Sequence, residues 1–417
     1  MKKSLLAVGL AAALLAPQAV GAEGFGIVEW SAEGVAMGGA RMFAEGDAAN
    51  VAYNPASITK IQGKAMKLSA TYLSPHGQYD MELNNVGQAL GKETSGRNRV
   101  HPAWAPGSYY VRQIDEKNWI GTGTFARFAM VSEFENGSAA SFNSRLAKLN
   151  GISFTPVFAH KFDEKWSAAV GAEINYVGLE LQKNMMVPTG VAQKPYVAAE
   201  TQTKGESFAM GWNAAANYTF DDKNEMGVVY RSRMTHSLEA DFKMNGNKVA
   251  DAYGVVTLPD TWSIGYNHKF DDKTRVELNA TRTNWSTYDA LDIYFSNDIT
   301  GKLPPAVLSP KNWESGWRYA IGAEHKLSDK YSVMAGLAYD GSCIPYEGAD
   351  FIVPTGNRKT YTIGGQYHDD KQTLGVTMGY MDVGSLDIKG TATDLYDSAH
   401  THDNYVTIFG ISYQRNF

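Results

Sequence analysis

The sequence has little cysteine, no long apolar run after its first residues and no basic run. Cys343 is the only cysteine, so no intramolecular disulfide can form and the fold is stabilised by other means. No run of about 18 apolar residues follows residue 22, which argues against a transmembrane helix. The formal net charge is −6, and without basic clusters the chain has no electrostatic footprint for nucleic acid.

The first residues predict secretion. Lys2 and Lys3 precede an apolar run over 5–15, and small residues occupy 20–22. This order of a positive segment, an apolar segment and small residues is typical of a cleaved signal peptide. The apolar run is too short to cross a bilayer, which needs about 18 to 20 residues. We therefore predict a signal peptide over residues 1–22.

Aromatic residues and glycine are abundant in the rest of the chain, with 23 Tyr, 9 Trp and 41 Gly. Over 262–270 apolar and aromatic residues alternate with Ser263, Gly265, Asn267 and Lys269. Period-two alternation places each set on one face of a strand, and aromatic girdles are typical of transmembrane barrels. A soluble β-sandwich also alternates and stays open as an alternative.

A triplet of acidic or polar residues ending in lysine recurs along the chain at intervals of about 40 to 60 residues. Each interval is long enough for two strands joined by a long loop, with the triplet as the tight turn to the next pair. With both chain ends on the periplasmic side, six such turns predict an all-β antiparallel barrel of about 14 strands. The turns are Asp115-Glu116-Lys117, Asp163-Glu164-Lys165, Asp221-Asp222-Lys223, Asp271-Asp272-Lys273, Ser328-Asp329-Lys330 and Asp369-Asp370-Lys371. Extracellular loops are expected at 75–102, 183–204, 242–257, 287–313, 342–356 and 388–402.

The C-terminus ends on an aromatic residue, Phe417, in a predicted last strand. Tyr405, Phe409, Ile411 and Tyr413 share its face. This ending resembles the signal by which the barrel assembly machinery takes up bacterial outer-membrane barrels, although Arg415 stands where that signal has an apolar residue. Location in the outer membrane of a Gram-negative bacterium follows as an expectation.

The N-terminal segment carries a set of short motifs in a fixed order. The motifs are Gly24-Phe25, Glu29-Trp30-Ser31, Gly34, Gly39-Ala40, Asp47-Ala48 and Asn54-Pro55-Ala56. Together they resemble the hatch of the FadL family of long-chain fatty acid and hydrocarbon transporters, and further matches extend to Phe417.

The resemblance implies a hatch over residues 23–63 inside a barrel over 64–417. It implies passive transport of a hydrophobic ligand that leaves sideways, into outer-membrane lipid, through a kink in the third strand. Gly121 and Gly123 weaken that strand, and we expect the kink there. Asn54, Pro55 and Ala56 are expected beside the gap, where Asn54 can bond to backbone that the kink leaves unpaired.

The ligand expected first is a long-chain fatty acid, with neutral aromatic or aliphatic hydrocarbons as the alternative. Fatty acid carriers of the family place basic residues on strands 5 and 10, where this chain has Gly178 and Glu314. We therefore considered other cations that could face the lumen and meet a carboxylate. These candidates are Arg231, Arg233, Arg318 and Lys326.

Other functions have weaker support. A hydrolase, a general porin and an adhesin stay possible, but no constellation of catalytic residues singles out an enzyme, and we expect none. His400 and His402 are more simply solvated loop residues than metal ligands, so neither a metal nor a cofactor is expected. A closed barrel has no edge strand that needs a partner, which predicts a monomer.

Overall fold

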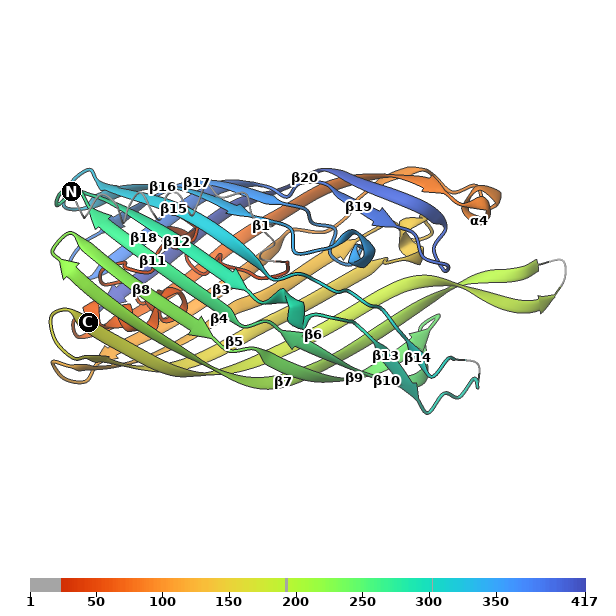
Figure 1. Cartoon of the computed structure of the whole chain (residues 1–417), viewed down its shortest axis with the longest axis horizontal. Coiled ribbons are helices and arrows are strands. Elements are labelled where there is room, and N and C mark those ends of the chain that lie inside the picture. Colours follow the sequence, from red (N-terminus) through yellow and green to blue (C-terminus); the bar gives the residue numbers. More distant parts are fainter. Residues whose placement is uncertain (1–23, 192–193, 302) are drawn as a thin grey trace.

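The computed structural model describes residues 24–191, 194–301 and 303–417, and the predicted signal peptide lies outside them. Strands dominate, and each pairs with its neighbours in an antiparallel ladder. The first strand also pairs with the last over Ala65↔Asn416 to Leu83↔Tyr396, which closes the sheet on itself. The result is a closed 14-stranded antiparallel barrel, as predicted (Figure 1).

Two of the 14 strands are interrupted. β8 and β9 together form the seventh strand, because both pair with β7, and β10 and β11 together form the eighth. The barrel strands are β1 (Lys64–Leu83), β3 (Ala103–Gln113), β4 (Asn118–Glu133), β5 (Leu146–Lys161), β6 (Trp166–Val191), β7 (Lys194–Asp221), β8 (Asn224–Arg231), β9 (Met234–Met244), β10 (Asn247–Leu258), β11 (Thr261–Lys269), β12 (Thr274–Thr283), β15 (Gly316–Lys326), β16 (Tyr331–Asp340), β17 (Arg358–His368), β18 (Gln372–Asp382) and β20 (Tyr396–Asn416).

All six predicted turns connect strands at the barrel end that also holds the C-terminus (Figure 1). Asp163 shows why the polar triplets turn: its carboxylate accepts hydrogen bonds from the backbone N–H of Lys165 and of Trp166, each at 2.8 Å. These bonds favour the charged form, so the pKa of the Asp163 carboxyl lies below its ordinary value. In the same way, a hydrogen bond from the backbone N–H of Lys273 lowers the pKa of the Asp271 carboxyl, and one from Lys371 lowers that of Asp369.

The outer surface is apolar in a band around the barrel, because alternate residues of each strand point outward. In β11, Trp262 is exposed while Asn267 is buried, as the alternation predicts. The last strand behaves likewise, with Phe409, Ile411 and Tyr413 outward. An apolar outer belt over a polar interior is what a lipid-facing barrel requires.

At the opposite end, two predicted loops are strands. Residues 183–191 continue β6 and pair with β7 as far as Val191↔Lys194, and 242–257 lie in the β9–β10 hairpin. Their polar composition indicated loops, but paired strands also tolerate polar residues beyond the apolar band. The short elements here are α4 (Asn85–Ala89), β2 (Ser95–Arg97), η2 (Ala140–Phe142), η3 (Trp285–Thr287), β13 (Ile293–Ser296), β14 (Ala306–Val307), η4 (Tyr346–Gly348) and β19 (Leu386–Lys389).

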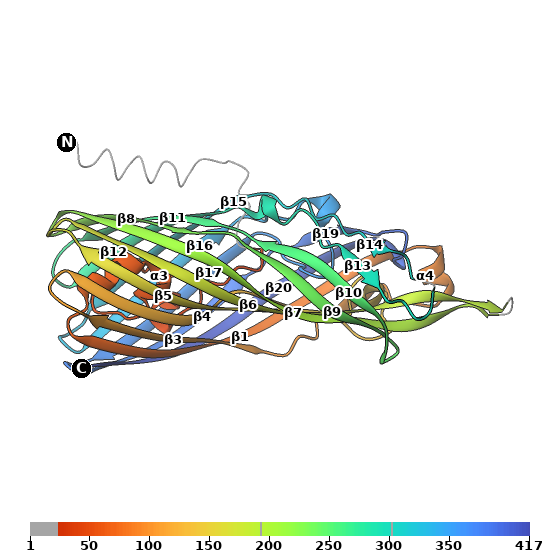
Figure 2. The same ribbon diagram turned by 90° about the horizontal axis from the view of Figure 1, so that it is seen from below.

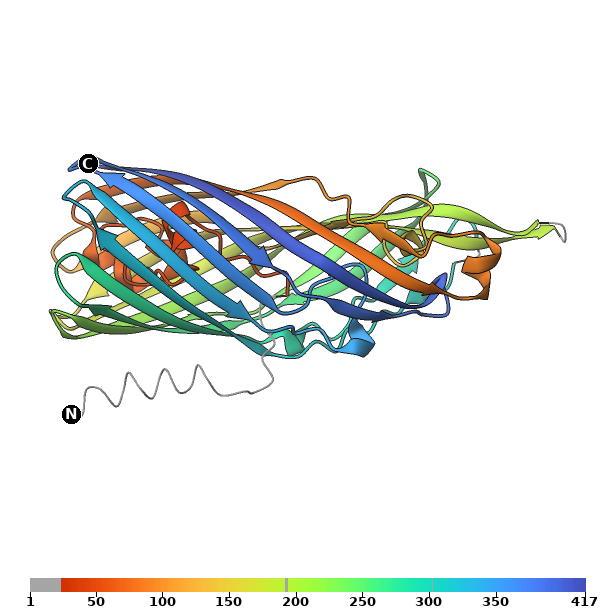
Figure 3. The same ribbon diagram turned by 90° about the horizontal axis from the view of Figure 1, so that it is seen from above.

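Residues 24–63 lie inside the barrel, mostly in the half that carries the turns (Figures 1, 2 and 3). They form α2 (Ala32–Ala36), α3 (Asn50–Tyr53) and η1 (Pro55–Lys60), and most of their residues are buried. We call this segment the hatch. In the described part of the chain no helix has the length and apolarity to cross a membrane.

The hatch contacts the wall of the barrel at a glycine, which has no side chain. A Cβ at Gly336 of β16 would lie 2.1 Å from the backbone N of Gly38, which only glycine permits. Gly38 itself has φ +61°, a conformation that favours glycine. Hatch backbone and wall backbone therefore meet directly on this side.

Candidate functional site

The wall is broken where β4 separates from β3. The two strands pair from Gln113↔Trp119 to Gly107↔Phe125, and beyond this point β4 no longer pairs with β3. β3 stays paired with β1 as far as Ala103. On its other side β4 carries one extra residue, Arg127, because Ala126 pairs with Ile152 and Phe128 with Gly151. Such a bulge bends a strand and interrupts its ladder.

This position corrects our expectation for the kink. Gly121 and Gly123 pair regularly with both neighbouring strands, four or more residues before the bulge. Their lack of a side chain has another cause, because a Cβ at either position would lie 2.9 Å from a methyl group of Val51 in α3. The two glycines make room for the hatch.

Replacing Gly123 by alanine is therefore expected to destabilise the barrel. The new methyl group must displace Val51 or Tyr109, and overpacking of this kind costs about 1–3 kcal/mol. Urea unfolding followed by tryptophan fluorescence measures the cost. Gly365→Ala is the matched control, because the nearest atom to its Cβ lies 3.4 Å away; equal midpoints for the two variants would contradict the assignment.

The freed edge of β4 is covered by the start of the hatch. Ile27 donates its backbone N–H to the carbonyl of Arg127 at 2.9 Å, and Ala129 donates to the carbonyl of Phe25 at 3.0 Å. The indole Nε1 of Trp30 donates to the carbonyl of Ala126 at 2.7 Å. Residues 24–30 therefore satisfy the backbone groups that the break leaves open.

Asn54 does not have the role that the sequence suggested. Its Oδ1 accepts from Ala56 N at 3.1 Å, which caps η1 with Pro55 at the first position, and its Nδ2 donates to Asn217 Oδ1 at 2.7 Å. Asn217 is on β7, so this motif fastens the hatch to another part of the wall. The hatch covers the break with its own backbone instead.

Arg127 extends from the bulge into the lumen and is buried there. Its guanidinium lies 3.3 Å from the carboxylate of Glu173, and it donates to the carbonyls of Ser232 at 3.2 Å and Pro259 at 3.1 Å. Those carbonyls lie at the interruptions between β8 and β9 and between β10 and β11. One side chain thus links the three irregular strands.

A cavity of about 860 Å³ passes through the broken wall. Inside the barrel it is lined by Phe25, Arg318 and Arg358. At the break its lining is small, with alanines from both strands, and on the outer face it reaches the exposed side chains of Trp104 and Ile152. The alanines are Ala103, Ala105, Ala126 and Ala129. The cavity therefore joins the lumen to the lipid-facing surface.

Of the four candidate cations, two face the lumen and both are paired. Arg231 lies 3.6 Å from Glu173, and Arg318 lies 3.1 Å from Asp340. Arg233 is exposed and lies 3.2 Å from Asp260, and Lys326 is exposed near a turn. Only Arg318 lines the large cavity, and its charge is already neutralised.

The two positions where the resemblance led us to look for a basic residue, Gly178 and Glu314, do not line this cavity. Gly178 lies on the outer face of β6, between the buried side chains of Val177 and Leu179. Glu314 is exposed and precedes β15.

Sequence reasoning missed Arg358. It lines the cavity, donates to the carbonyl of Gly24 and lies 3.1 Å from Thr355 Oγ1. In the described part of the chain it forms no ion pair with a carboxylate. No local motif distinguishes this arginine at the start of β17, so only the folded chain places it.

A group of aromatic rings was also missed as a site. Phe25 packs against four rings at centroid distances of 4.6 Å (Trp285), 5.5 Å (Tyr288), 5.7 Å (Trp313) and 6.1 Å (Phe128). We call these four rings the aromatic box. Gly24-Phe25 and Trp285-Ser286 stood out in the sequence, but nothing there indicated that they meet.

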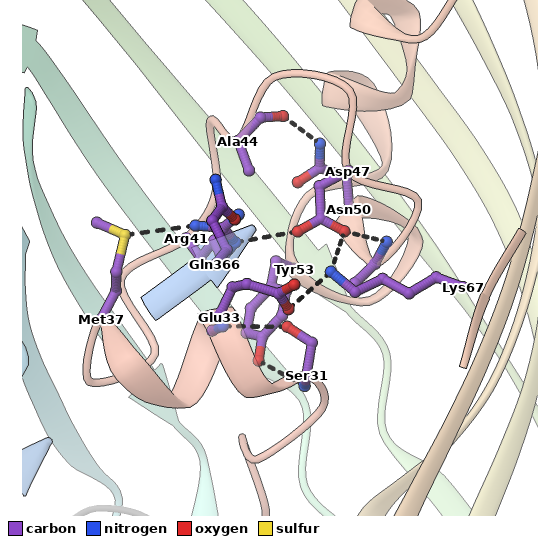
Figure 4. A network of polar contacts seen from close by, with 12 residues as sticks. Ser31, Glu33, Met37, Arg41, Ala44, Asp47, Asn50, Tyr53, Lys67 and Gln366 are labelled. Carbon is purple, nitrogen blue, oxygen red and sulfur yellow. Dashed lines mark hydrogen bonds and ion pairs between the residues drawn. The ribbon is translucent and has the colours of Figure 1, made fainter. Parts of the chain in front are cut away.

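Ion pairs fix the hatch to the barrel wall (Figure 4). Lys67 of β1 is buried, and its Nζ lies 2.8 Å from carboxylate oxygens of both Glu33 and Asp47. Asp47 also lies 3.0 Å from Arg41. On the last strand, Gln414 accepts from Ala48 N at 2.9 Å and donates to the carbonyl of Gly46 at 2.6 Å. Both strands at the closing seam therefore hold residues 46–48.

The two histidines of the last loop lie on β20. His400 is 2.6 Å from Asp387, and His402 is 3.2 Å from Asp80 and 3.1 Å from Asp403. Within the described ranges no three His, Cys, Asp or Glu side chains are placed to hold a metal ion.

Comparison with known proteins places this arrangement in a family. The family model described as outer membrane protein transport protein (OMPP1/FadL/TodX) matches residues 12–417. The long-chain fatty acid transport protein of Escherichia coli K12 is 23% identical, with 91% of each chain covered. Outer membrane protein P1 of Haemophilus influenzae is 24% identical, with 100% of each chain covered.

Solved structures share the fold. A FadL homologue of Pseudomonas aeruginosa superposes with a TM-score of 0.86 at 18% identity, covering 95% of this chain and 100% of that one. The toluene transporter TodX of P. putida gives a TM-score of 0.71 at 16% identity, covering 95% and 99%.

Proposed function

Because the chain belongs to the OMPP1/FadL/TodX family of outer membrane transport proteins, we propose that it carries hydrophobic small molecules passively through the outer membrane. The observation that supports this most directly is the cavity that leads from the lumen through the break between β3 and β4. Residues 23–63 act as its hatch, and the closed barrel functions as a monomer with the surrounding lipid as its partner.

A sideways exit suits an apolar solute. Burial of apolar surface is favourable by about 25 cal/mol per Å², so a solute in the lumen gains by entering the bilayer and loses by entering the periplasm. The break lies beside Trp104 and Ile152, whose exposed side chains belong to the apolar outer face. Movement down this gradient needs no energy source.

The charges of the lumen favour a neutral solute. Arg127 and Arg231 share Glu173, and Arg318 is paired with Asp340, so a carboxylate would have to break existing ion pairs. The toluene transporter TodX shares the fold, which agrees with this choice. A long-chain fatty acid is the second candidate, because Arg358 has no carboxylate partner among the described residues and the E. coli relative is a fatty acid transport protein.

Uptake by a strain that lacks its own hydrophobic transporters tests the proposal. We expect Ala129→Trp to remove most uptake of toluene, because the indole fills the break, while barrel folding is retained. Oleate is measured beside toluene: uptake of toluene alone supports the neutral solute, and uptake of oleate that depends on Arg358 supports the second candidate.

Ala216→Trp is the matched control, since Ala216 lies near the turn end of β7 and does not line the cavity. Both variants are checked for heat-modifiable migration on SDS gels, which reports a folded barrel. Unchanged uptake in Ala129→Trp would show that solute does not pass through the break. Uptake of neither compound by the wild type would overturn transport itself.

A further inference from the structure

Arg282 of β12 faces the lipid side of the barrel, in a row of outward aromatic residues. It lies directly opposite Trp262 of β11 and Trp317 of β15, and residues opposed in this way share one face of a sheet. Its guanidinium carbon lies 5.7 Å from the centroid of the Trp317 ring, and its Nε donates to Asn284 Oδ1 at 3.2 Å. Among the described residues no carboxylate lies within ion-pair distance of Arg282. Its charge is therefore not neutralised by the protein.

A second arginine is linked to Arg282 through two shared side chains. Arg233, whose side chain is 59% exposed, lies 3.2 Å from Oδ1 of Asp260. The other carboxylate oxygen of Asp260 accepts from Asn284 Nδ2 at 2.6 Å, and Asn284 also accepts from Arg282. These contacts join two guanidinium groups through a single carboxylate, so the group carries a net positive charge. We call Arg233, Asp260, Asn284 and Arg282 the arginine rim.

The arginine rim lies at the extracellular border of the apolar outer band. Trp262 and Phe270 are exposed aromatic residues at the two ends of the outward row of β11. A transmembrane strand crosses the apolar core in about 9–11 residues, which the stretch 262–270 provides. Phe270 adjoins a turn, and the short turns of bacterial outer-membrane barrels face the periplasm. Trp262, and Arg282 opposite it, therefore lie at the level of the outer-leaflet headgroups.

The surroundings of the rim suit a lipid phosphate better than a dissolved anion. A guanidinium binds phosphate through two parallel N–H donors, and basic residues at a membrane surface attract anionic lipids. The rings of Trp262 and Tyr230 lie 4.5 Å apart on the membrane side of the rim, and Trp262 is half exposed. They offer apolar area that a free phosphate ion cannot use. The outer leaflet of a Gram-negative outer membrane supplies a matching partner, since the lipid A of its lipopolysaccharide carries phosphate on a sugar.

We propose that the arginine rim binds a phosphate of lipid A, with the sugar and acyl chains of that lipid against Trp262 and Tyr230. Six strand pairings separate β12 from β4, so the site lies about half-way round the barrel from the break. Neither arginine of the rim lines the cavity that passes through the wall. The site anchors this side of the barrel in the outer leaflet and does not depend on the proposed transport function.

Binding of diphosphorylated lipid A to the purified full-length protein in detergent tests the proposal, followed by native mass spectrometry over a series of lipid concentrations. We expect Arg233→Gln combined with Arg282→Gln to raise the dissociation constant at least about tenfold, because charge-assisted hydrogen bonds are lost. Lys204→Gln combined with Lys359→Gln is the matched control. It removes the same charge from two exposed lysines of β7 and β17 and is expected to bind like the wild type.

Two further probes separate lipid phosphate from other ligands. Lipid A without phosphate is expected to bind the wild type at least about tenfold more weakly, and inorganic phosphate at the same concentration is expected not to displace lipid A. Equal dissociation constants for the rim variant and the control variant, or for the two forms of lipid A, would overturn the site. Displacement by inorganic phosphate would show a site for a free anion instead. Heat-modifiable migration on SDS gels establishes that each variant is folded, so that lost binding reflects the rim.

Discussion

Uptake is expected to stop when the hatch is locked to β4 by a disulfide between Gly26→Cys and Phe128→Cys. Residues 26 and 128 form an isolated antiparallel bridge, flanked by the bonds from Ile27 to Arg127 and from Ala129 to Phe25. That pattern marks a non-hydrogen-bonded pair, whose Cα atoms lie about 4.5 Å apart. A disulfide spans this distance, since its Cα atoms usually lie about 4.4–6.8 Å apart.

Uptake is expected to stop because residues 24–30 cover the backbone edge that β4 exposes at the break. A covalent link holds them there, so the cavity cannot widen and Phe25 cannot leave its box. Toluene uptake is measured in oxidised cells and again after reduction with dithiothreitol. Both substitutions are present in both states, so the reduced protein controls for the loss of Phe128.

Cys343→Ser serves as the background, because Cys343 is the chain's single natural thiol and a third cysteine could form the wrong disulfide. We expect this background to transport like the wild type in either redox state. If the oxidised double-cysteine protein transports as fast as the reduced one, residues 24–30 do not have to leave β4 during passage.

The second large effect is expected from Lys67→Met. Among the described residues, removal of the Lys67 ammonium leaves Glu33 without a cation within ion-pair distance and leaves Asp47 with Arg41 alone. Breaking a buried ion pair by deleting one partner costs about 3–5 kcal/mol. We expect a lower midpoint of urea unfolding and a hatch that detaches from the wall, seen as new ion conductance in planar bilayers.

Lys64→Met is the control, because Lys64 lies at the start of the same strand and is exposed. Glu33→Gln added to Lys67→Met removes the uncompensated carboxylate and is expected to restore part of the stability. If Lys67→Met and Lys64→Met unfold at the same urea concentration, the ion pairs do not hold the hatch.

The barrel itself could be predicted from the sequence because its signals are local. The triplet at 163–165 turns the chain through bonds between residues two and three apart, and alternation such as that over 262–270 needs only one strand. Most described residues of the loops predicted at 183–204 and 242–257 lie in paired strands, because composition does not tell a polar strand beyond the membrane from a loop.

The site was harder to predict because its causes are not local. The break lies at the bulge formed by the extra residue Arg127 and not at Gly121 and Gly123. Neither the residue type of Arg127 nor its neighbours in the sequence indicate a bulge there. Gly121 and Gly123 indicated a weak strand, whereas their real requirement is set by Val51, about 70 residues away. Arg231 and Arg233 are two residues apart and would share one face of an unbroken strand. Because the strand is interrupted at Ser232, only Arg231 points inward. Side-chain direction is predictable only along an unbroken strand.

The contacts of residues 46–48 bear on how the barrel is built. Lys67 on the first strand and Gln414 on the last both hold this short segment, and these strands meet at the seam. Residues 46–48 therefore bridge the two strands whose pairing closes the cylinder, so the hatch stabilises the seam of the barrel as well as filling its lumen.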